Sequence, residues 1–488
     1  QVIGDRTFIS IDEIKHTTHL GMGPCRGKRC IPRLRTALRS RGIELVGDAT
    51  PRAPLSNQLT LGEITPAKKG DTYLVANRDI FKKIEVSALI AGGGIAGSSL
   101  FRYMAEAGMN PVLVNADRGS SWRNIGGGRT AFSLPELAEI AAQNHHIFKE
   151  LQYLSNIDYK PIRYISFAHD EETYKALEAS KAWSKAEMIA PKQFREEISP
   201  YFNANPKKYI SALVSEDCWQ ATPGKVVDLV RNLGIAAGGT VMEDCRVLEA
   251  CREGKYTSVL VQTHDKKYVE YRTEHFVNAL GSGAGKLCDS MGIDAGLYPV
   301  RHQAFITRRL PMLGKHGTNL DMLIDRQDYK GFSAVYGQQI AYTGQIIGCA
   351  SPKLDAMRID KNLKVNTKAF LEIVSEMFSE WIPDLAGVGI QAVWAGYYTE
   401  PRYIVDPELG LFVGMCGHGF MLSQYIARMY VDKLLGRPVP EYFEKSLCAD
   451  RRKNGKAAFF AGAYRTVRPA GCRLLVYRGS RCDALFAG

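Results

Sequence analysis

The stretch that decides the fold is VSALIAGGGIAGSSLFRYMAEAGMNPVLVN, residues Val86 to Asn115. Its apolar start, residues 86–91, has the length of a buried parallel strand and runs into three glycines in G-x-G-x-x-G spacing. Gly92 permits a tight turn, Gly94 lets backbone approach a phosphate, and Gly97 lets the next helix pack closely on the strand. We therefore predict a strand, turn and helix that bind a dinucleotide pyrophosphate at the helix N-terminus.

Inside this unit we expect a helix over residues 98–107 and a second strand over 111–115, with Ile95 and Ala96 as further cofactor contacts. The second strand of such units normally ends in Glu or Asp, which binds the ribose hydroxyls. Here Asn115 takes that place, and an amide lacks the charge-assisted hydrogen bond. Asp117 either substitutes for the missing carboxylate or is a solvated turn residue.

Composition describes an ordinary globular protein. The 488 residues predict two or three domains, and 45% hydrophobic with 23% charged residues is typical of such chains. We predict no membrane-spanning segment and no secretory signal, and the eleven scattered cysteines favour a reducing compartment. Of the net charge of +12, residues 449–488 carry +7, which we interpret as a solvated basic tail and not as a nucleic-acid surface.

One pair of cysteines stands apart from the others. Cys25 and Cys30 form a C-x4-C loop in HLGMGPCRGKRCIPRLR, where basic neighbours favour thiolates. Two thiolates are half of the ligand set of a [2Fe-2S] cluster or a structural zinc. Cys25 and Cys30 are therefore the candidate metal ligands, with a chance C-x4-C spacing as the alternative.

Residues 11–64 resemble the second half of a bacterioferritin-associated-ferredoxin-like [2Fe-2S] domain, in IDEIKHTTHLGMGPCRGKRCIPRLR through ATPRAPLSNQLTLGEI. In that family a C-x-C pair precedes this segment. We expect either that the sequence begins inside the domain or that the first pair has been lost. A cluster would bind only if two further cysteines were supplied.

Residues 86–445 resemble the FAD-dependent D-amino-acid oxidase-like superfamily. The resemblance implies an α/β fold, in which a Rossmann-type FAD-binding domain carries a mixed-sheet substrate domain and follows a small helical ferredoxin-associated-like domain. We expect the following division: 1–64 partial cluster domain, 65–85 linker, 86–150, 208–298 and 395–445 FAD-binding, 151–207 and 299–394 substrate-binding, and 446–488 tail.

The resemblance also places FAD contacts in glycine-rich loops far apart in the sequence. SSWRNIGGGRTAF carries a loop along the flavin, VNALGSGAGK a second close approach, and VGMCGHGF the start of a helix whose positive end faces the flavin. The implied contacts are Arg123, Asn124, Gly126, Gly127, Gly128, the backbone of Val247, Gly281, Gly283, Gln303, Gly417, His418, Gly419, Phe420 and Met421.

Members of the superfamily bind the substrate carboxylate through Arg, often with Tyr. In WAGYYTEPRYIVD that place is taken by Tyr398, with Arg402 four residues on. Arg402 either serves from a shifted register or is a surface residue of the loop. Tyr398, Arg402 and His418 are the candidate catalytic residues, and the departure from the usual pattern leaves the substrate open.

Together these features predict an FAD-dependent dehydrogenase that oxidises the C–N bond of an amino acid or secondary amine to an imine. Proline, hydroxyproline, sarcosine, glycine and opines are the expected substrate classes, and a partner subunit or carrier accepts the electrons. One alternative is a glycerol-3-phosphate-type dehydrogenase, for which Arg308 and Arg309 are the adjacent basic pair; another is a flavin-bearing scaffold without catalysis. We expect a cytoplasmic oligomer, with peripheral attachment to the inner membrane as a variant.

Overall fold

The computed structural model describes residues 7–11, 14, 18, 20, 30–46, 80–203, 205–327, 330–352, 363 and 367–444. The chain divides into two compact units, Gln1–Asp71 and Thr72–Gly488.

The described part of the first unit pairs two short parallel strands around one helix. The elements are β1 (Phe8–Ser10), α2 (Cys30–Arg39) and β2 (Glu44–Val46). Parallel strands need a crossover, and α2 lies in that crossover. The unit was expected to be helical, but its described part contains strands as well. A small core of Ile9, Ile11, Ile14, Leu38 and Leu45 holds it together.

The second unit is built on two sheets, of which the first contains the glycine motif. Its main path runs β10-β11-β12-β3-β4-β9, with β19 beside β12 and β18 beside β19. β12, β3, β4 and β9 are parallel neighbours. The strands are β3 (Ile80–Ala91), β4 (Val112–Val114), β9 (Thr240–Met242), β10 (Arg246–Glu253), β11 (Tyr256–Gln262), β12 (Tyr268–Asn278), β18 (Ile404–Asp406) and β19 (Leu411–Val413).

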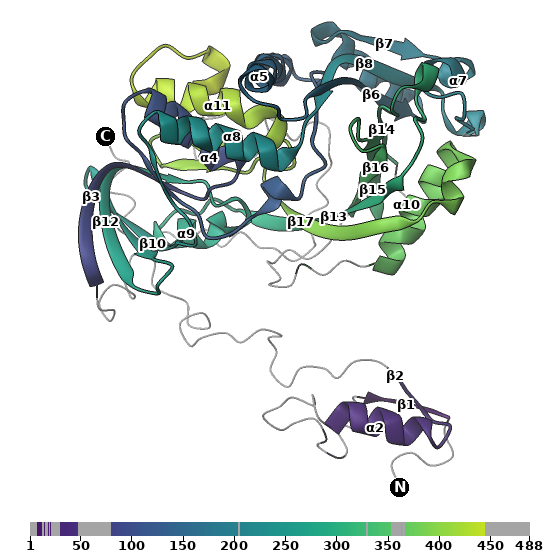
Figure 1. Cartoon of the computed structure of the whole chain (residues 1–488), viewed down its shortest axis with the longest axis horizontal. Helices are drawn as coiled ribbons and strands as arrows, with labels where there is room; N and C mark the ends of the chain where they lie inside the picture. The colour runs from purple at the N-terminus through teal and green to yellow at the C-terminus, as the bar shows by residue number, and fades with distance from the viewer. Residues whose placement is uncertain are drawn as a thin grey trace. The chain divides into compact units, whose positions relative to one another are not determined.

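Four helices form a layer on this sheet. They are α4 (Ile95–Glu106), α5 (Pro135–Leu154), α8 (Pro223–Ala236) and α11 (Gly419–Leu434), and they lie together on one side of the sheet (Figure 1). Helix α4 packs against both α8 and α11. Phe101 and Met104 of α4, Phe148 of α5 and Ile426 of α11 are fully buried where these helices meet. Burial of such side chains stabilises the layer by about 1.5–3 kcal/mol each.

The second sheet has nine strands and mixed pairing, as predicted for the substrate side. Its order is β17-β13-β16-β15-β14-β6-β8-β5, with β7 on β8, and only the β14–β6 pair is parallel within the described residues. The strands are β5 (Gly127–Gly128), β6 (Lys160–Ala168), β7 (Ala186–Ile189), β8 (Ser211–Gln220), β13 (Tyr298–Arg309), β14 (Met322–Asp325), β15 (Phe332–Gln339), β16 (Gln345–Pro352) and β17 (Ile390–Glu400).

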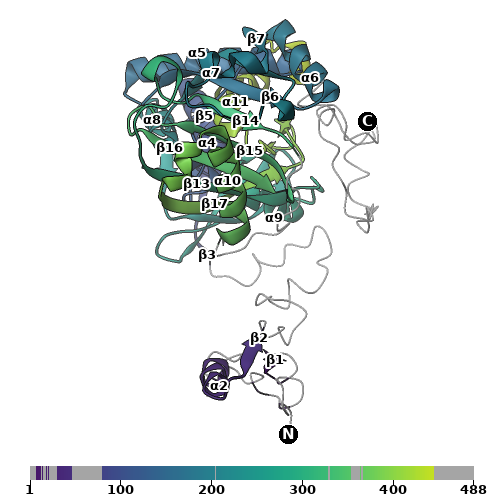
Figure 2. The ribbon, with the colours of Figure 1, turned by 90° about the vertical axis from the view of Figure 1, so that its right-hand side faces the viewer.

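Helix α10 (Thr367–Trp381) packs on β15 and β16 (Figure 2). Its buried Phe370, Ile373 and Trp381 share a core with this sheet. The remaining short helices are α6 (Glu171–Glu178), α7 (Phe194–Glu197), α9 (Ala284–Ser290), η2 (Ser120–Trp122), η3 (Ala179–Trp183), η4 (Pro191–Gln193), η5 (Pro206–Lys208), η6 (Gly281–Gly283), η7 (Lys315–Gly317) and η8 (Pro383–Gly387). Across the described residues, no helix combines the length and the apolar character that crossing a bilayer requires.

Several boundaries differ from those expected. Strand β3 begins at Ile80, inside the stretch predicted as linker. Its first half was missed because solvent-exposed lysines there interrupt the apolar pattern. Val247, whose backbone was expected to meet the cofactor, is the second residue of β10, and the preceding strand β9 ends at Met242. β5, β8 and the end of β17, which fall in ranges expected to bind FAD, are strands of the nine-stranded sheet.

Candidate active site

The glycine turn at the end of β3 has no room for side chains. Gly92 has φ +109°, and a Cβ there would lie 2.6 Å from the carbonyl oxygen of Ala279. A Cβ on Gly97 would lie 1.8 Å from the carbonyl oxygen of Gly92, so α4 packs directly on the turn. This is the close helix–strand approach that the G-x-G-x-x-G spacing predicts.

Helix α4 begins directly after Gly94, which has extended backbone and no side chain to cap the helix. The first amides of a helix have no intrahelical acceptor. One of them, the Ile95 amide, donates to Ser121 Oγ at 2.9 Å. The amides of Ala96 and Gly97 come next, so the turn combines a positive helix end with close backbone, which suits a phosphate.

Helix η2 connects this helix end to the second sheet. Ser121 receives the Ile95 amide, and the neighbouring Ser120 donates from Oγ to the Tyr397 carbonyl at 2.8 Å. Trp394 of β17 donates from Nε1 to the Arg123 carbonyl at 2.8 Å. The end of the glycine motif and strand β17 are therefore held together by four consecutive residues, Ser120 to Arg123.

The loop that follows η2 is shaped largely by its own polar groups. Arg123 donates to the Gly119 carbonyl at 3.0 Å, and Asn124 donates to the Ser121 carbonyl at 2.6 Å while accepting from the Gly126 amide at 2.8 Å. Their side chains, expected to lie along the flavin, are thus engaged in holding the turn.

The three glycines of this loop are required by neighbouring protein groups. A Cβ on Gly126, Gly127 or Gly128 would lie 2.3 Å from the Ala221 carbonyl oxygen, 2.1 Å from the Tyr164 hydroxyl or 2.2 Å from the Trp219 ring, respectively. From the sequence, these glycines were expected to permit close approach of the cofactor. Packing on β8 and β6 gives each of them a separate reason.

Three other predicted contacts, Gly281, Gly283 and Val247, lie at strand ends of the first sheet. Gly281 and Gly283 form η6 after β12, and the position of a Cβ on Gly281 (φ +55°) is open, with nothing within 4 Å. Val247 is buried in the same core as Val112 and Val114 of β4. Cys245, two residues before it, donates its amide to the Asn115 carbonyl at 3.0 Å, which puts Val247 near the end of the glycine motif.

The G-H-G turn precedes α11, as predicted. Gly417 has φ +72°, and His418 is the N-cap residue of the helix. Phe420 and Met421 are buried in the helical core, where Phe420 meets Phe148 edge-on at 5.1 Å. A cofactor at this helix end would meet Gly419, Phe420 and Met421 through backbone and not through side chains.

Tyr398 lies where the two sheets meet. Its hydroxyl is 3.0 Å from the hydroxyl of Tyr336 on β15, and its ring stacks on His302 of β13 at a centroid distance of 3.6 Å. The ring also contacts the Gly417 turn, since a Cβ there would be 2.4 Å from the ring. Burial raises the pKa of Tyr398 and of Tyr336, so both hydroxyls keep their protons at neutral pH.

Arg402 is a partly buried residue of the site and not a surface residue. Its Nε is 3.8 Å from Glu400 Oε1, and the same oxygen accepts from the Cys416 thiol. Burial opposes the charge of Arg402, but Cys416, Glu400 and Tyr403 outweigh it and raise the pKa of Arg402. Arg402 is therefore charged at any physiological pH.

His418 is held as a neutral imidazole. Its Nδ1 is 2.5 Å from the Tyr403 hydroxyl, and Phe132 meets its ring edge-on at 5.6 Å. Burial lowers the pKa of His418 well below its usual value, and the positive charges of Arg402, Arg129 and Arg326 lower it further. The structure thus brings Tyr398, Arg402 and His418 into one electropositive site.

Several members of this site were missed by the sequence argument: His302, Tyr336, Glu400, Cys416, Tyr403, Arg129 and Arg326. Strand alternation carried a signal for one of them, because Tyr398 and Glu400 are two residues apart on β17 and so face the same side. His302 and Tyr336 come from strands whose order in the sheet the sequence does not reveal, and the others lie in loops and turns between elements.

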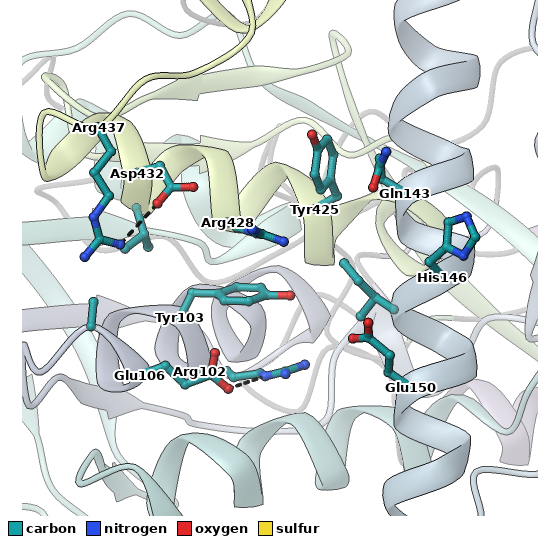
Figure 3. Close-up of a pocket in the computed structure, with 13 residues that line it drawn as sticks. Arg102, Tyr103, Glu106, Gln143, His146, Glu150, Tyr425, Arg428, Asp432 and Arg437 are labelled. Atoms are coloured by element: carbon teal, nitrogen blue, oxygen red, sulfur yellow. Dashed lines mark hydrogen bonds and ion pairs between the residues drawn. The ribbon is translucent and has the colours of Figure 1, made fainter.

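A separate pocket of about 420 Å³ lies among α4, α5 and α11 (Figure 3). Arg102 pairs with Glu106 at 2.7 Å and Arg437 with Asp432 at 3.3 Å along its wall, and Arg428 and Glu150 also line it. It opens beside the C-terminal half of α4, some two to three helical turns from the glycine motif. It is therefore not part of the nucleotide site.

The metal prediction gains no support. Cys25 lies outside the described residues, and Cys30 is the first residue of α2. Within the described residues no group of three or more His, Cys, Asp or Glu side chains is arranged to hold a metal ion.

Residues 87–433 match the model of a protein family described as FAD dependent oxidoreductase (DAO). The chain belongs to this family. The match covers both sheets, from the glycine motif through α11, so the glycine turn and the Tyr398 site lie inside the family's shared region.

Among known proteins, the chain is 25% identical over 306 residues to mitochondrial dimethylglycine dehydrogenase from Mus musculus, covering 59% of this chain and 32% of that protein. It thus spans about a third of the length of this curated relative. Two solved structures share its fold. L-proline dehydrogenase from P. horikoshii has a TM-score of 0.62 at 22% identity, over 75% of this chain and 100% of that one. Glycine oxidase from Bacillus cereus has a TM-score of 0.60 at 20% identity, over 75% and 99%.

The residues present fit the family's FAD. Several buried polar atoms have no hydrogen-bond partner among the described residues and lie on elements around the glycine turn and the Tyr398 site. They are Trp122 Nε1, Thr130 Oγ1, His302 Nδ1, Gln338 Oε1 and Ser423 Oγ. Buried polar groups are nearly always satisfied. Orphaned atoms next to a glycine turn and a helix N-terminus therefore suit a polar, ring-bearing ligand.

Proposed function

We propose that this FAD-dependent oxidoreductase is a dehydrogenase of an amino acid or secondary amine, which it oxidises at the C–N bond to an imine. This proposal rests on Arg402, a charged residue held beside two tyrosine hydroxyls and a neutral histidine at the junction of the two sheets. The similar proteins include a dehydrogenase of proline and one of dimethylglycine, which supports the same substrate class.

The substrate carboxylate is assigned to Arg402. A guanidinium binds a carboxylate through charge-assisted hydrogen bonds, and Arg129 and Arg326 add positive charge around the site. The paired hydroxyls of Tyr398 and Tyr336 supply a further donor for a carboxylate oxygen. The same positive field disfavours an ammonium group, so the substrate amine enters as its neutral form, which carries the lone pair that the oxidation needs.

The residues assigned to FAD are the glycine turn (Gly92, Gly94, Ile95, Ala96, Gly97), Asn115, the loop after η2 (Arg123, Asn124, Gly126, Gly127), the strand ends (Val247, Gly281, Gly283) and the start of α11 (Gly417, His418, Gly419, Phe420, Met421). Bound FAD supplies the redox chemistry by accepting a hydride equivalent from the carbon next to the amine. The N-terminus of α11 stabilises negative charge near it, and His418, being neutral, adds no charge of its own to that helix end.

A dehydrogenase and an oxidase differ in the electron acceptor: an oxidase passes the electrons to dioxygen, and a dehydrogenase passes them to another carrier. We assign the acceptor to a partner subunit or carrier, on the ferredoxin-like resemblance of residues 11–64. The [2Fe-2S] cluster itself and the oligomeric state stay predictions.

Anaerobic addition of proline, sarcosine, dimethylglycine and glycine to the flavin-loaded protein tests the proposal. We expect one of these amines to bleach the flavin absorbance, and an artificial electron acceptor to sustain turnover faster than air does. Rapid stoichiometric peroxide formation in air would instead show that the protein is an oxidase. Failure of every amine and amino acid in a broad panel would reject the substrate class.

The glycerol-3-phosphate alternative loses its main support. Arg308 and Arg309, its adjacent basic pair, are exposed at the end of β13, and Arg308 lies against Gly389. The Tyr398 site lies at the other end of the β13–β17 pair, where Tyr398 is opposite Val300. Glycerol 3-phosphate in the same panel provides the direct comparison.

A further inference from the structure

The turn between β9 and β10 places a glutamate beside Asn115. The backbone N–H of Asn115 donates to the Met242 carbonyl at 2.9 Å, and the backbone carbonyl of Asn115 accepts from the Cys245 N–H at 3.0 Å. Glu243 and Asp244 are the two residues between these hydrogen bonds. Asp244 has φ +55°, a turn conformation that reverses the chain over the end of β4.

Glu243 is fixed on both of its oxygens. Asn115 donates from Nδ2 to Oε2 at 2.6 Å, and Arg231 of α8 donates from Nη1 to Oε1. The same Arg231 donates from Nη2 to the Gly93 carbonyl at 2.7 Å. One carboxylate is thus tied to the end of β4, to α8 and to the glycine turn, across 128 residues of sequence between Asn115 and Glu243.

Burial divides the roles within this group. Asn115 is 6% exposed and the Arg231 side chain 11%, whereas the Glu243 side chain is 51% exposed. An ionised carboxylate has about four acceptor positions, and the hydrogen bonds from Asn115 and Arg231 use two of them. The other two acceptor positions of Glu243 are open to a ligand. They lie near the end of β4, where a carboxylate normally binds the ribose hydroxyls in such folds.

We propose that Glu243 supplies, from the β9–β10 turn, the carboxylate that Asn115 cannot offer to the adenosine ribose of FAD. Asn115 and Arg231 are positioning residues that orient it. The proposal rests on the family's cofactor and is independent of the amine assigned as substrate. Asp117, the earlier candidate for this role, has no hydrogen bond or ion pair with these residues in the described structure.

Nucleotide affinity tests the proposal without turnover. ADP, the adenosine half of FAD, and 2′-deoxy-ADP are competed against FAD on the flavin-depleted full chain, with flavin fluorescence as the readout. We expect the normal protein to prefer ADP over 2′-deoxy-ADP and Glu243→Gln to lose this preference. We also expect Glu243→Gln to weaken FAD binding by about tenfold or more, the effect of removing a charge-assisted hydrogen bond.

Two further variants keep the result specific. Glu274→Gln removes a comparable exposed carboxylate, paired with Lys255 at 2.7 Å on the same sheet, and should leave both affinities unchanged. Asn115→Asp in the Glu243→Gln background returns a carboxylate to the end of β4 and should restore part of the preference for ADP.

Equal affinity of the normal protein for ADP and 2′-deoxy-ADP would overturn the proposal. So would a Glu243→Gln variant that binds FAD more weakly but keeps the preference, because Glu243 would then serve only as a structural bracket. If no amine is oxidised while the nucleotide preference behaves as expected, the amine proposal fails and this one stands.

Discussion

The ring of Tyr398 occupies the space that a side chain at position 417 would need. A Cβ on Gly417 would lie 2.4 Å from two ring carbons, Cε2 and Cζ. Tyr398 belongs to the nine-stranded sheet and Gly417 to the turn before α11, so this contact joins the substrate side to the helix end assigned to the flavin.

Gly417→Ala should therefore destabilise the protein by more than its backbone strain. Alanine at φ +72° costs about 1 kcal/mol, and the clash with Tyr398 adds to it. Gly436→Ala is the matched control, since Gly436 has φ +69° with nothing within 4 Å. We expect a larger loss of unfolding free energy, and lower flavin content, for Gly417→Ala alone. Equal losses in the two variants would show that the turn can move away from the ring.

Tyr398→Phe should lower kcat/KM for the amino-acid substrate by about tenfold while flavin content stays unchanged. The change removes one hydroxyl of a pair 3.0 Å apart and breaks the hydrogen bond between them, at a cost of about 0.5–1.5 kcal/mol. Tyr336→Phe should have a similar effect. Tyr342→Phe, at an exposed position, is the control for both and should leave the kinetics unaltered. Normal kinetics in both buried variants would remove the hydroxyls from substrate binding.

Arg402→Met should raise KM for a carboxylate substrate and lower kcat/KM by about ten- to a hundredfold, since hydrogen bonds to charged groups contribute about 1.5–3 kcal/mol. Arg402→Lys should recover only part of the loss, because an ammonium lacks the planar fork of guanidinium. Steady-state kinetics with the best amine of the panel measure both. Arg309→Met, at the exposed end of β13, serves as the control. A Met variant with unaltered KM would move the carboxylate anchor elsewhere.

Acid should destabilise the protein in part through His302. Burial and the charge of Arg402 lower the pKa of His302 to about 3, whereas an unfolded histidine titrates near 6.5. Below about pH 6.5 the unfolded state therefore binds a proton that the folded state refuses, and stability falls as pH decreases toward 3. Urea unfolding between pH 7 and pH 4.5 should show a shallower decline for His302→Asn. His146→Asn, on an exposed side chain of α5, should keep the original slope.

Local patterns predicted the parts of this fold that are continuous in sequence. The glycine spacing and the apolar runs around it predicted a strand, a turn, a helix and a second strand, which the structure places at Ile80–Ala91, Ile95–Glu106 and Val112–Val114. Each of these elements buries one face of its own chain, so periodicity alone carries the signal.

Contacts between distant strands were beyond the reach of such patterns. Tyr336 and Tyr398 lie on strands separated by β16 and β13, about 14 Å apart at the usual spacing, yet their hydroxyls meet. Arg402 was left between two interpretations because its surroundings, Glu400 and Cys416, come together only when the turn before α11 folds back on β17. Glu243 was overlooked for the same reason, since nothing in its neighbourhood marks it as a partner of Asn115.

Adjacent serines in η2 have opposite attachments: Ser121 holds the first amide of α4, and Ser120 holds the backbone of Tyr397. A displacement of the helix end is thus transmitted within one peptide unit to the strand that bears Tyr398. We therefore expect nucleotide binding at the glycine turn to be coupled to the order of the Tyr398 site, so removal of the flavin should also weaken the binding of substrate analogues.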